Sequence, residues 1–275
     1  MKHQIGFIGG GNMAQAIIAG LLNGGCSTSN IIVSDPNPAC RSALGALGVS
    51  CFEQSGPVVA QADLIILAVK PQIVDVVLAQ LSQTLQGTQI IISIAAGITI
   101  SSIRQQLNNA PNAIVRVMPN TPALIGQGIS ALASDSPLDG TTKTAVQEIF
   151  NSCGKTVWVG GEDTMDTITA VSGSGPAYFF LMIENLINTG VRLGLPPEVA
   201  RDLVVQTAKG AAEMVEFSDV GPDVLRQRVT SPRGTTEAAL KVFNDGDFAD
   251  LVDRALVAAR DRAGELSEDV PLNLS

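Results

Sequence analysis

Short apolar runs rich in β-branched residues alternate with amphipathic stretches through the first 160 residues. Runs of the first kind predict buried strands, and apolar positions three to four residues apart predict helices. Strands are predicted at residues 4–8, 31–34, 64–69, 90–94, 113–117, 129–133 and 156–159. Helices are predicted at residues 13–22, 73–85 and 143–152. The alternation indicates an α/β domain whose parallel sheet is covered on both sides.

Strand signals stop near residue 163, and only helical signals follow. Helices are predicted at residues 176–192, 197–215, 222–229, 235–243 and 248–266. The first of them contains PAYFFLMIENLI, which is more apolar than one small bundle needs to bury. We expect this helix to form an oligomer interface; the alternative is a fully buried core helix.

The charge distribution divides the chain at the same place. The formal net charge is −9; residues 1–160 hold seven basic and seven acidic side chains, and residues 161–275 hold ten and nineteen. We therefore expect two domains, residues 1–160 and 161–275. Nucleic-acid binding is not expected, because it requires a basic face.

Composition narrows the class of protein further. The chain is 45% hydrophobic and 16% charged, which is typical of a globular protein. No apolar run is long enough to span a bilayer, and no signal peptide is visible. We expect a cytoplasmic location and no membrane partner.

Cysteine and histidine usage limits the possible chemistry. Cys26, Cys40, Cys51 and Cys153 form no CxxC pair, so reduced structural cysteines are expected. The single histidine, His3, lies just before the first apolar run. One histidine excludes a histidine-based triad and a multi-histidine metal site, and no metal is predicted.

A glycine-rich stretch separates the first predicted strand from the first predicted helix. Gly9, Gly11 and Ala14 fit the pattern G-x-G-x-x-A at the start of a βαβ unit. Gly9 suits the tight turn, Gly11 allows the backbone to approach a pyrophosphate, and Ala14 allows close helix packing. The first amides of the helix would then face the phosphate oxygens. This context favours a Rossmann-type dinucleotide-binding domain over a simple turn.

The end of the second strand leaves the choice of dinucleotide open. Asp35 could hydrogen-bond a ribose 2′-hydroxyl, which favours NAD, or could serve as a turn residue before Pro36. Ser34, Asn37 and Arg41 could instead hold a 2′-phosphate. NADP(H) and NAD(H) are both compatible with this sequence.

Two other strand ends carry residues suited to a ligand. Lys70 and Pro71 follow one strand, and Ala95 and Ala96 follow the next. Ligands of open parallel sheets bind at the carboxyl ends of the strands. Small residues there leave room for a flat nicotinamide ring, and Lys70 is either a cofactor contact or a solvated charge.

A loop rich in Gly, Ser and Thr precedes the helix predicted at residues 235–243. It reads VTSPRGTT from Val229 to Thr236, and SGSGP from Ser172 has a similar composition. Free amides and hydroxyls at a helix start suit a small carboxylate. The alternative is an ordinary helix cap.

Six motifs in order resemble those of the pyrroline-5-carboxylate reductase family, over essentially the whole chain. They are GFIGGGNMA, LAVKPQ, SIAAGIT, RVMPNTPALIGQG, AVSGSGPAYFF and VTSPRGTTEAAL. One position departs from the family pattern. The family loop reads S-P-G-G-T-T, and Arg233 replaces the first of those glycines. If that position requires a positive φ, arginine is strained there. Alternatively, the positive charge of Arg233 would help to hold the carboxylate of a ligand.

The resemblance implies an α/β Rossmann-type N-terminal domain followed by an all-α C-terminal dimerisation domain. It implies that NAD(P)H delivers hydride to C5 of Δ1-pyrroline-5-carboxylate, giving L-proline in the last step of proline biosynthesis. Thr236 would be the catalytic residue, bonded to the ring nitrogen. The homodimer or higher homo-oligomer would draw each active site from two chains.

The resemblance also assigns binding residues. Those for the substrate are Ser231, Gly234, Thr235, Thr236 and Glu162. Those for the cofactor are Gly9, Gly10, Gly11, Asn12, Met13, Ser34, Asp35, Ser55, Ala68, Val69, Lys70, Pro71, Ala95 and Ala96.

Two other functions fit parts of the sequence. A β-hydroxyacid dehydrogenase of similar build would use a lysine on the first interdomain helix, but residues 172–183 contain none. A non-catalytic dinucleotide sensor would explain the glycine motif but not the threonine-rich loop.

Overall fold

The computed structural model describes residues 3–268 and divides the chain into two compact units. Unit 1 contains residues up to Ser174 together with those from Ala259 onward, and unit 2 contains Gly175–Ala258. The boundary that the sequence places after residue 160 stays a prediction. No helix among the described residues is both long and apolar enough to cross a membrane.

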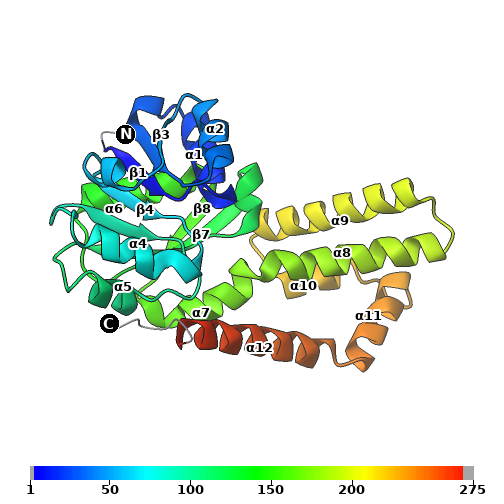
Figure 1. The fold of residues 1–275 in the computed structure, drawn as a ribbon. Coiled ribbons are helices and arrows are strands. Elements are labelled where there is room, and N and C mark those ends of the chain that lie inside the picture. The colour runs from blue at the N-terminus through cyan, green and yellow to red at the C-terminus, as the bar shows by residue number, and fades with distance from the viewer. Residues whose placement is uncertain (1–2, 269–275) are drawn as a thin grey trace. The chain divides into compact units, whose positions relative to one another are not determined.

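Unit 1 is built on one eight-stranded sheet (Figure 1) with the strand order β3-β2-β1-β4-β5-β6-β7-β8. Its strands are β1 (Ile5–Ile8), β2 (Ile31–Ser34), β3 (Ser50–Phe52), β4 (Leu64–Leu67), β5 (Ile90–Ser93), β6 (Ile114–Met118), β7 (Gly128–Ser134) and β8 (Gly154–Trp158). All seven predicted strands are present within one or two residues of their expected bounds. They are mostly buried on both faces, which explains their continuous apolar runs.

The expectation of a wholly parallel sheet is wrong at one junction. β7 runs antiparallel to β6, with Val117 opposite Leu132. The connection between these strands is residues 119–127, shorter than the dozen or so residues that a parallel crossover needs. β8 pairs parallel to β7 because helix α6 (Gly140–Asn151) forms the crossover between them.

Short elements lack the pattern that would predict them. The edge strand β3 has three residues, none of them buried. α2 (Pro38–Gly45) buries only Leu44, and α5 (Ile100–Gln106) buries only Ile100 and Ile103. The helices α3 (Gly56–Val59) and α7 (Met165–Ile168) have four residues each. Such segments are fixed by tertiary packing and caps rather than by periodicity.

Helices cover the two faces of the sheet and enclose two cores. α1 (Asn12–Asn23), α2 and α6 pack on one face, where Phe7 and Phe150 are buried. α3, α4 (Val74–Leu81) and α5 pack on the other face, around Ile65 and Leu78. α1 comes close to the end of α6, since a Cβ added to Gly20 would lie 2.4 Å from the carbonyl oxygen of Ser152.

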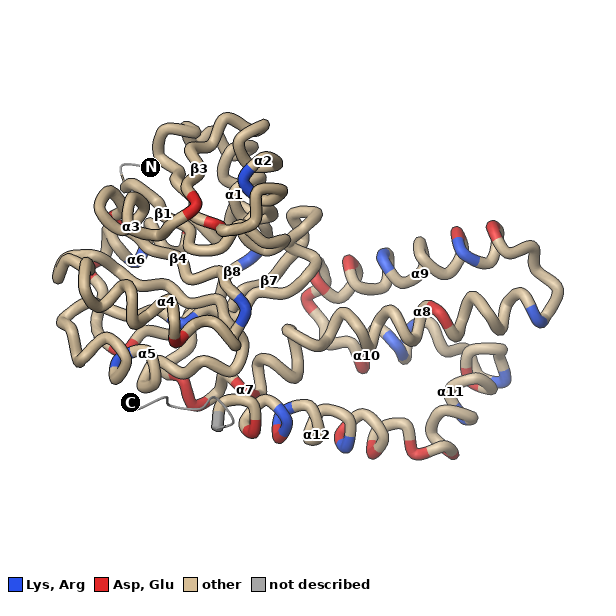
Figure 2. Tube along the Cα trace, in the orientation of Figure 1, with Lys and Arg blue, Asp and Glu red and all other residues tan. Residues whose placement is uncertain are grey.

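Unit 2 is entirely helical. Its elements are α8 (Gly175–Arg192), α9 (Pro197–Phe217), α10 (Pro222–Arg228), α11 (Thr235–Asp245) and the first half of α12 (Phe248–Glu268). α8 and α9 form an antiparallel hairpin that turns at Gly194, whose φ is +104°. Acidic and basic residues are spread along α9 and α12 (Figure 2).

The apolar residues of α8 are not the interior of a single chain. Phe179 and Phe180 are 71% and 63% exposed, and Met214 and Phe217 on α9 are also exposed. The alternative of a fully buried core helix is therefore wrong for one chain, and the exposed apolar surface is typical of an interface.

Two glycine substitutions test the packing of unit 1. We expect Gly20→Ala to lower the free energy of unfolding by about 1–3 kcal/mol, because the added methyl group meets the backbone of Ser152. The methyl group added by Gly45→Ala meets no atom within 4 Å. This substitution should raise the free energy of unfolding by about 0.5 kcal/mol, because it restricts the unfolded chain. Urea denaturation measures both; a Gly20→Ala variant as stable as wild type would contradict the α1–α6 contact.

Candidate active site

Hydrogen bonds align four strand ends at one edge of the sheet. Ile8 lies opposite Ser34 and Leu67, and Leu67 lies opposite Ser93. The ladder continues one residue further, since the amides of Gly9 and Ala68 donate to Ser34 O and Ile8 O at 2.8 Å. The loops that follow β1, β2, β4 and β5 therefore start at the same level, at the carboxyl edge where such sheets bind ligands.

Gly9 turns the chain from β1 into α1 where no other residue fits well. Its φ is +100°, in the left-handed region that favours glycine. A Cβ at this position would lie 2.5 Å from the carbonyl oxygen of Ala68. Gly9 is therefore required by the fold itself.

The start of α1 has the properties of an anion site. Its N-cap is Gly11, and no side chain in the described chain caps the helix. A Cβ on Gly11 would meet nothing within 4 Å, so the space beside the N-cap position is open. By contrast, Asp139 caps α6 by accepting from the amides of Thr141 and Thr142 at 2.9 and 3.0 Å. Of α1 and α6, only α1 leaves the amides at its N-terminus available to a phosphate.

Asp35 links β2 to the glycine loop. Its Oδ2 accepts from the Gly10 amide at 2.7 Å, and its Oδ1 accepts from the Asn37 amide at 2.8 Å. Asp35 is thus a turn residue, and its carboxylate also lies beside the glycine loop. Arg41 donates through Nη1 to the carbonyls of Asp35 and Pro36 at 2.7 and 2.8 Å.

The remaining residues assigned to the cofactor also belong to unit 1. Ser34 is buried at the end of β2, and Ser55 is the N-cap residue of α3. Ala68 and Val69 follow β4, and Lys70 begins the turn at Pro71 with an exposed side chain. Ala95 is buried and Ala96 is exposed after β5. The structure therefore brings the cofactor set to the ends of β1, β2, β3, β4 and β5.

The residues assigned to the substrate come together in unit 2, except for Glu162. Ser231, Gly234, Thr235 and Thr236 form the turn into α11, whose N-cap is Gly234. No side chain caps α11 within the described chain, so this helix also presents free amides. The reading of the loop as an ordinary side-chain cap is thus not supported.

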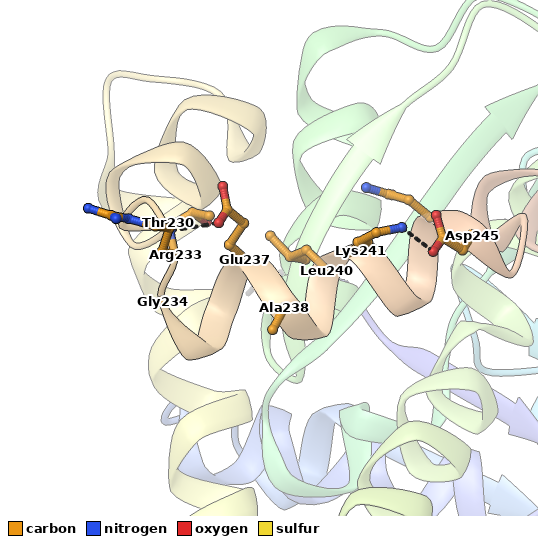
Figure 3. Close-up of a pocket in the computed structure, with 9 residues that line it drawn as sticks. Thr230, Arg233, Gly234, Glu237, Ala238, Leu240, Lys241 and Asp245 are labelled. Atoms are coloured by element: carbon orange, nitrogen blue, oxygen red, sulfur yellow. Dashed lines mark hydrogen bonds and ion pairs between the residues drawn. The ribbon is translucent and has the colours of Figure 1, made fainter.

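Arg233 has a φ of +59°, so the condition for strain at this departure from the family motif is met. The loop keeps its shape because the Arg233 amide donates to Oε2 of Glu237 at 2.7 Å (Figure 3). Arg233, Glu237, Lys241 and Asp245 line an open hollow along α11. Ser231, Thr235 and Thr236 do not line this hollow.

Glu162 belongs to unit 1 and is already engaged by protein groups. Its carboxylate accepts from the Ile100 amide at 2.8 and 3.0 Å and from Arg116 Nη1 at 2.6 Å. Reasoning from the sequence did not single out Arg116 as the partner of Glu162. The available signal was a charged residue inside the apolar strand of the RVMPNTP motif.

Three of the four cysteines are poor nucleophiles. Burial raises the pKa of the Cys26, Cys51 and Cys153 thiols, so all three stay protonated at neutral pH.

Known proteins match the chain over nearly its full length. The pyrroline-5-carboxylate reductase of Pseudomonas aeruginosa is 43% identical over 268 residues, covering 97% of this chain and 98% of that protein. The chain belongs to the pyrroline-5-carboxylate reductase family. The resemblance seen in the six sequence motifs is thereby confirmed.

Solved structures of the reductase family agree. The Coxiella burnetii reductase has a TM-score of 0.91 at 38% identity, covering 97% of this chain and 99% of that one. The Plasmodium falciparum reductase, solved with NADP bound, has a TM-score of 0.86 at 33% identity and covers 97% and 98%.

Two family models match separate parts of the chain. Residues 162–266 match pyrroline-5-carboxylate reductase dimerisation, and residues 4–97 match NADP oxidoreductase coenzyme F420-dependent. The predicted fold class is confirmed: a Rossmann-type N-terminal part is followed by a helical dimerisation part.

Gly11→Ala tests the anion site without disturbing the fold. The methyl group meets no protein atom, so we expect an unchanged free energy of unfolding. It would occupy the space through which a pyrophosphate approaches, so the Kd for NADPH and NADH should rise at least about 10-fold. Titration calorimetry measures the Kd.

The matched control for that variant is Gly140→Ala. Gly140 also begins a helix and also has open space at its Cβ, but Asp139 caps its helix. Its cofactor Kd should not change. Equal affinities in wild type and Gly11→Ala would place the pyrophosphate elsewhere.

Proposed function

We propose that this chain reduces Δ1-pyrroline-5-carboxylate to L-proline with NAD(P)H, the last step of proline biosynthesis. The observation that carries the proposal is full-length identity of 43% to a protein of that activity, across both units. The aligned strand ends and the uncapped start of α1 supply the dinucleotide site that such a reduction needs.

Unit 1 provides residues that fit a nicotinamide dinucleotide. We assign the pyrophosphate to the loop Gly9–Gly10–Gly11 and the amides of Asn12 and Met13, since the space beyond Gly11 is open. Ser34, Asp35 and Ser55 would contact the adenosine end. We assign the nicotinamide end to Ala68, Val69, Lys70, Pro71, Ala95 and Ala96. The cofactor, when bound, supplies the hydride.

The turn into α11 is the proposed substrate site. Free amides at a helix start attract a carboxylate, which fits Ser231, Gly234 and Thr235 around that group of the substrate. The Thr236 hydroxyl both donates and accepts hydrogen bonds, so it can hold the ring nitrogen before and after protonation.

The residue inventory is consistent with this chemistry. A cyclic imine is readily protonated, and the carbon of the resulting iminium ion accepts a hydride without a strong general acid from the protein. The chain has no histidine beyond His3, and burial raises the pKa of the Cys26, Cys51 and Cys153 thiols. Its contribution is therefore to hold and orient the imine carbon.

We further propose a homodimer or a higher homo-oligomer formed through the helical part. Support comes from the match of residues 162–266 to a dimerisation family and from the exposed apolar residues of α8 and α9. A cytoplasmic location is also proposed. The four free cysteines are typical of a reducing compartment.

A spectrophotometric assay tests the proposal. Wild type should oxidise NADPH with Δ1-pyrroline-5-carboxylate and should not reduce NADP+ with 3-hydroxy acids. Thr236→Ala should lower kcat/KM about 100-fold with an unchanged unfolding midpoint, because it removes one bond to the reacting ring. The matched control is Thr141→Ala, at the same position in α6. Cofactor binding without turnover in wild type would instead indicate a dinucleotide sensor.

Arg233→Gly separates the charge of the loop from its geometry. A glycine at this position keeps the hydrogen bond from the backbone amide to Glu237. It also relieves the left-handed conformation, which costs about 1–2 kcal/mol for a residue with a side chain. We expect the variant to stay folded and its KM for the imino acid to rise about 3- to 10-fold at unchanged kcat, because one cation near the carboxylate is lost. Arg233→Asn also lacks the positive charge, so its KM should be raised as much as that of Arg233→Gly. A KM equal to that of wild type in both variants would exclude a role for the guanidinium.

A further inference from the structure

Arg116 is a nearly buried cation on β6, an interior strand of the sheet of unit 1. It lies on β6 opposite Ser93, the last residue of β5, and its side chain is only 6% exposed. A buried guanidinium requires carboxylate partners. Both partners come from one short segment: Glu162 at 2.6 Å and Asp166 at 4.0 Å.

Glu162 does more than neutralise this cation. The same carboxylate accepts from the amide of Ile100, the first residue of α5. That amide is one of the orphan donors at a helix start. The N-cap residue Thr99 satisfies only the amide of Ser102, at 3.0 Å. Glu162 therefore links the first amide of α5 to the buried Arg116 on β6 by hydrogen bonds.

The segment fastened in this way is the loop after β5. It contains Ala95 and Ala96 and is held at its other end by the Ile94 amide, which donates to Leu67 O at 3.1 Å. Its middle is confined too, since Gly97 has a φ of +73° and a Cβ there would lie 3.1 Å from the carbonyl oxygen of Leu266. The loop is thus held at both ends and packed in the middle.

We propose that Glu162 is a positioning residue for the cofactor: clamped on Arg116, it holds the Ile100 amide and so fixes the Ala95–Ala96 loop against the nicotinamide end. This inference rests on the proposed function, which assigns that loop to the cofactor. It gives Glu162 no direct contact with substrate. Both of its oxygens lie within 3.0 Å of the Ile100 nitrogen, and one also accepts from Arg116.

The chain contains a matched control with the same architecture. Asp135 pairs with Arg104 and accepts from the amide of Ile114 at 3.1 Å. Ile114 begins β6, so this second clamp lies at the amino edge of the sheet, away from the proposed site. Loss of either carboxylate should destabilise unit 1, but only the loss of Glu162 should change cofactor binding.

The test compares Glu162→Gln with Asp135→Asn in the full chain. Calorimetric titration with NADPH and with NADH gives Kd, and thermal unfolding gives stability. We expect Glu162→Gln to raise both Kd values about 10-fold and to raise the KM for cofactor more than it lowers kcat. Asp135→Asn should lower the unfolding midpoint and leave Kd within twofold.

Ile100→Pro provides a second route if Glu162→Gln fails to fold. Proline is favoured at the first helical position and removes the amide hydrogen that Glu162 accepts, together with part of the buried Ile100 side chain. The extended backbone of Thr99 is compatible with a following proline. This variant keeps the Arg116–Glu162 pair, and its Kd for cofactor should rise about 10-fold as well.

Three results would overturn the proposal in different ways. An unchanged Kd in a destabilised Glu162→Gln variant would mean a purely structural pair. An unchanged Kd with a raised KM for the imino acid would mean direct substrate contact. An unchanged Kd in Ile100→Pro would exclude the link to the loop. Failure of wild type to bind either cofactor would instead contradict the proposed function.

Discussion

The register of the parallel strands is the constraint on which the rest of unit 1 depends. Hydrogen bonds set Ile8 level with Ser34 and Leu67, and Leu67 level with Ser93, so four loops leave the sheet at one edge. A shift of one residue in any strand would exchange the side chains on its two faces and displace its loop. Gly9 satisfies this constraint just beyond the paired ends of β1 and β4, where a Cβ would meet the backbone of Ala68. The dinucleotide site is thus a consequence of sheet geometry before any ligand contact is considered.

Helix starts in this chain differ in how their amides are satisfied, and the lack of a side-chain cap is not confined to the proposed sites, since α3, α4, α9 and α10 also have none among the described residues. Asp139 caps α6, Asn37 caps α2, and Glu162 engages the first amide of α5. The starts of α1 and α11 have no side-chain cap in the described chain. Uncapped amides cost stability unless another group satisfies them, and a phosphate or a carboxylate does so well. Arg233 adds backbone strain to the same region of α11, in keeping with the tendency of strained residues to occur at functional sites.

The helical unit has little interior of its own. Among its described residues only Gly175 and Ala200 are buried, whereas large apolar side chains on α8, α9 and α11 are exposed. A segment of this kind gains most of its hydrophobic stabilisation on association. Its match to a dimerisation family gives that exposed surface a physical reason. Stability of this part should therefore depend on protein concentration, unlike that of the sheet.

The sequence by itself determined the elements with a strong local signal. Buried parallel strands are continuous apolar runs, long helices repeat with a period near 3.6, and the glycine motif marks a backbone turn, so all three can be recognised without tertiary context. The six motifs determined the family in the same way. Only the tertiary structure decided the antiparallel direction of β7, the short elements β3, α2, α3, α5 and α7, and the partners of Glu162. Strand direction depends on whether a connection can cross the sheet, and the Arg116–Glu162–Ile100 cluster joins residues up to 62 positions apart. No local pattern encodes such a contact, because its free energy exists only after the sheet has brought the three groups together.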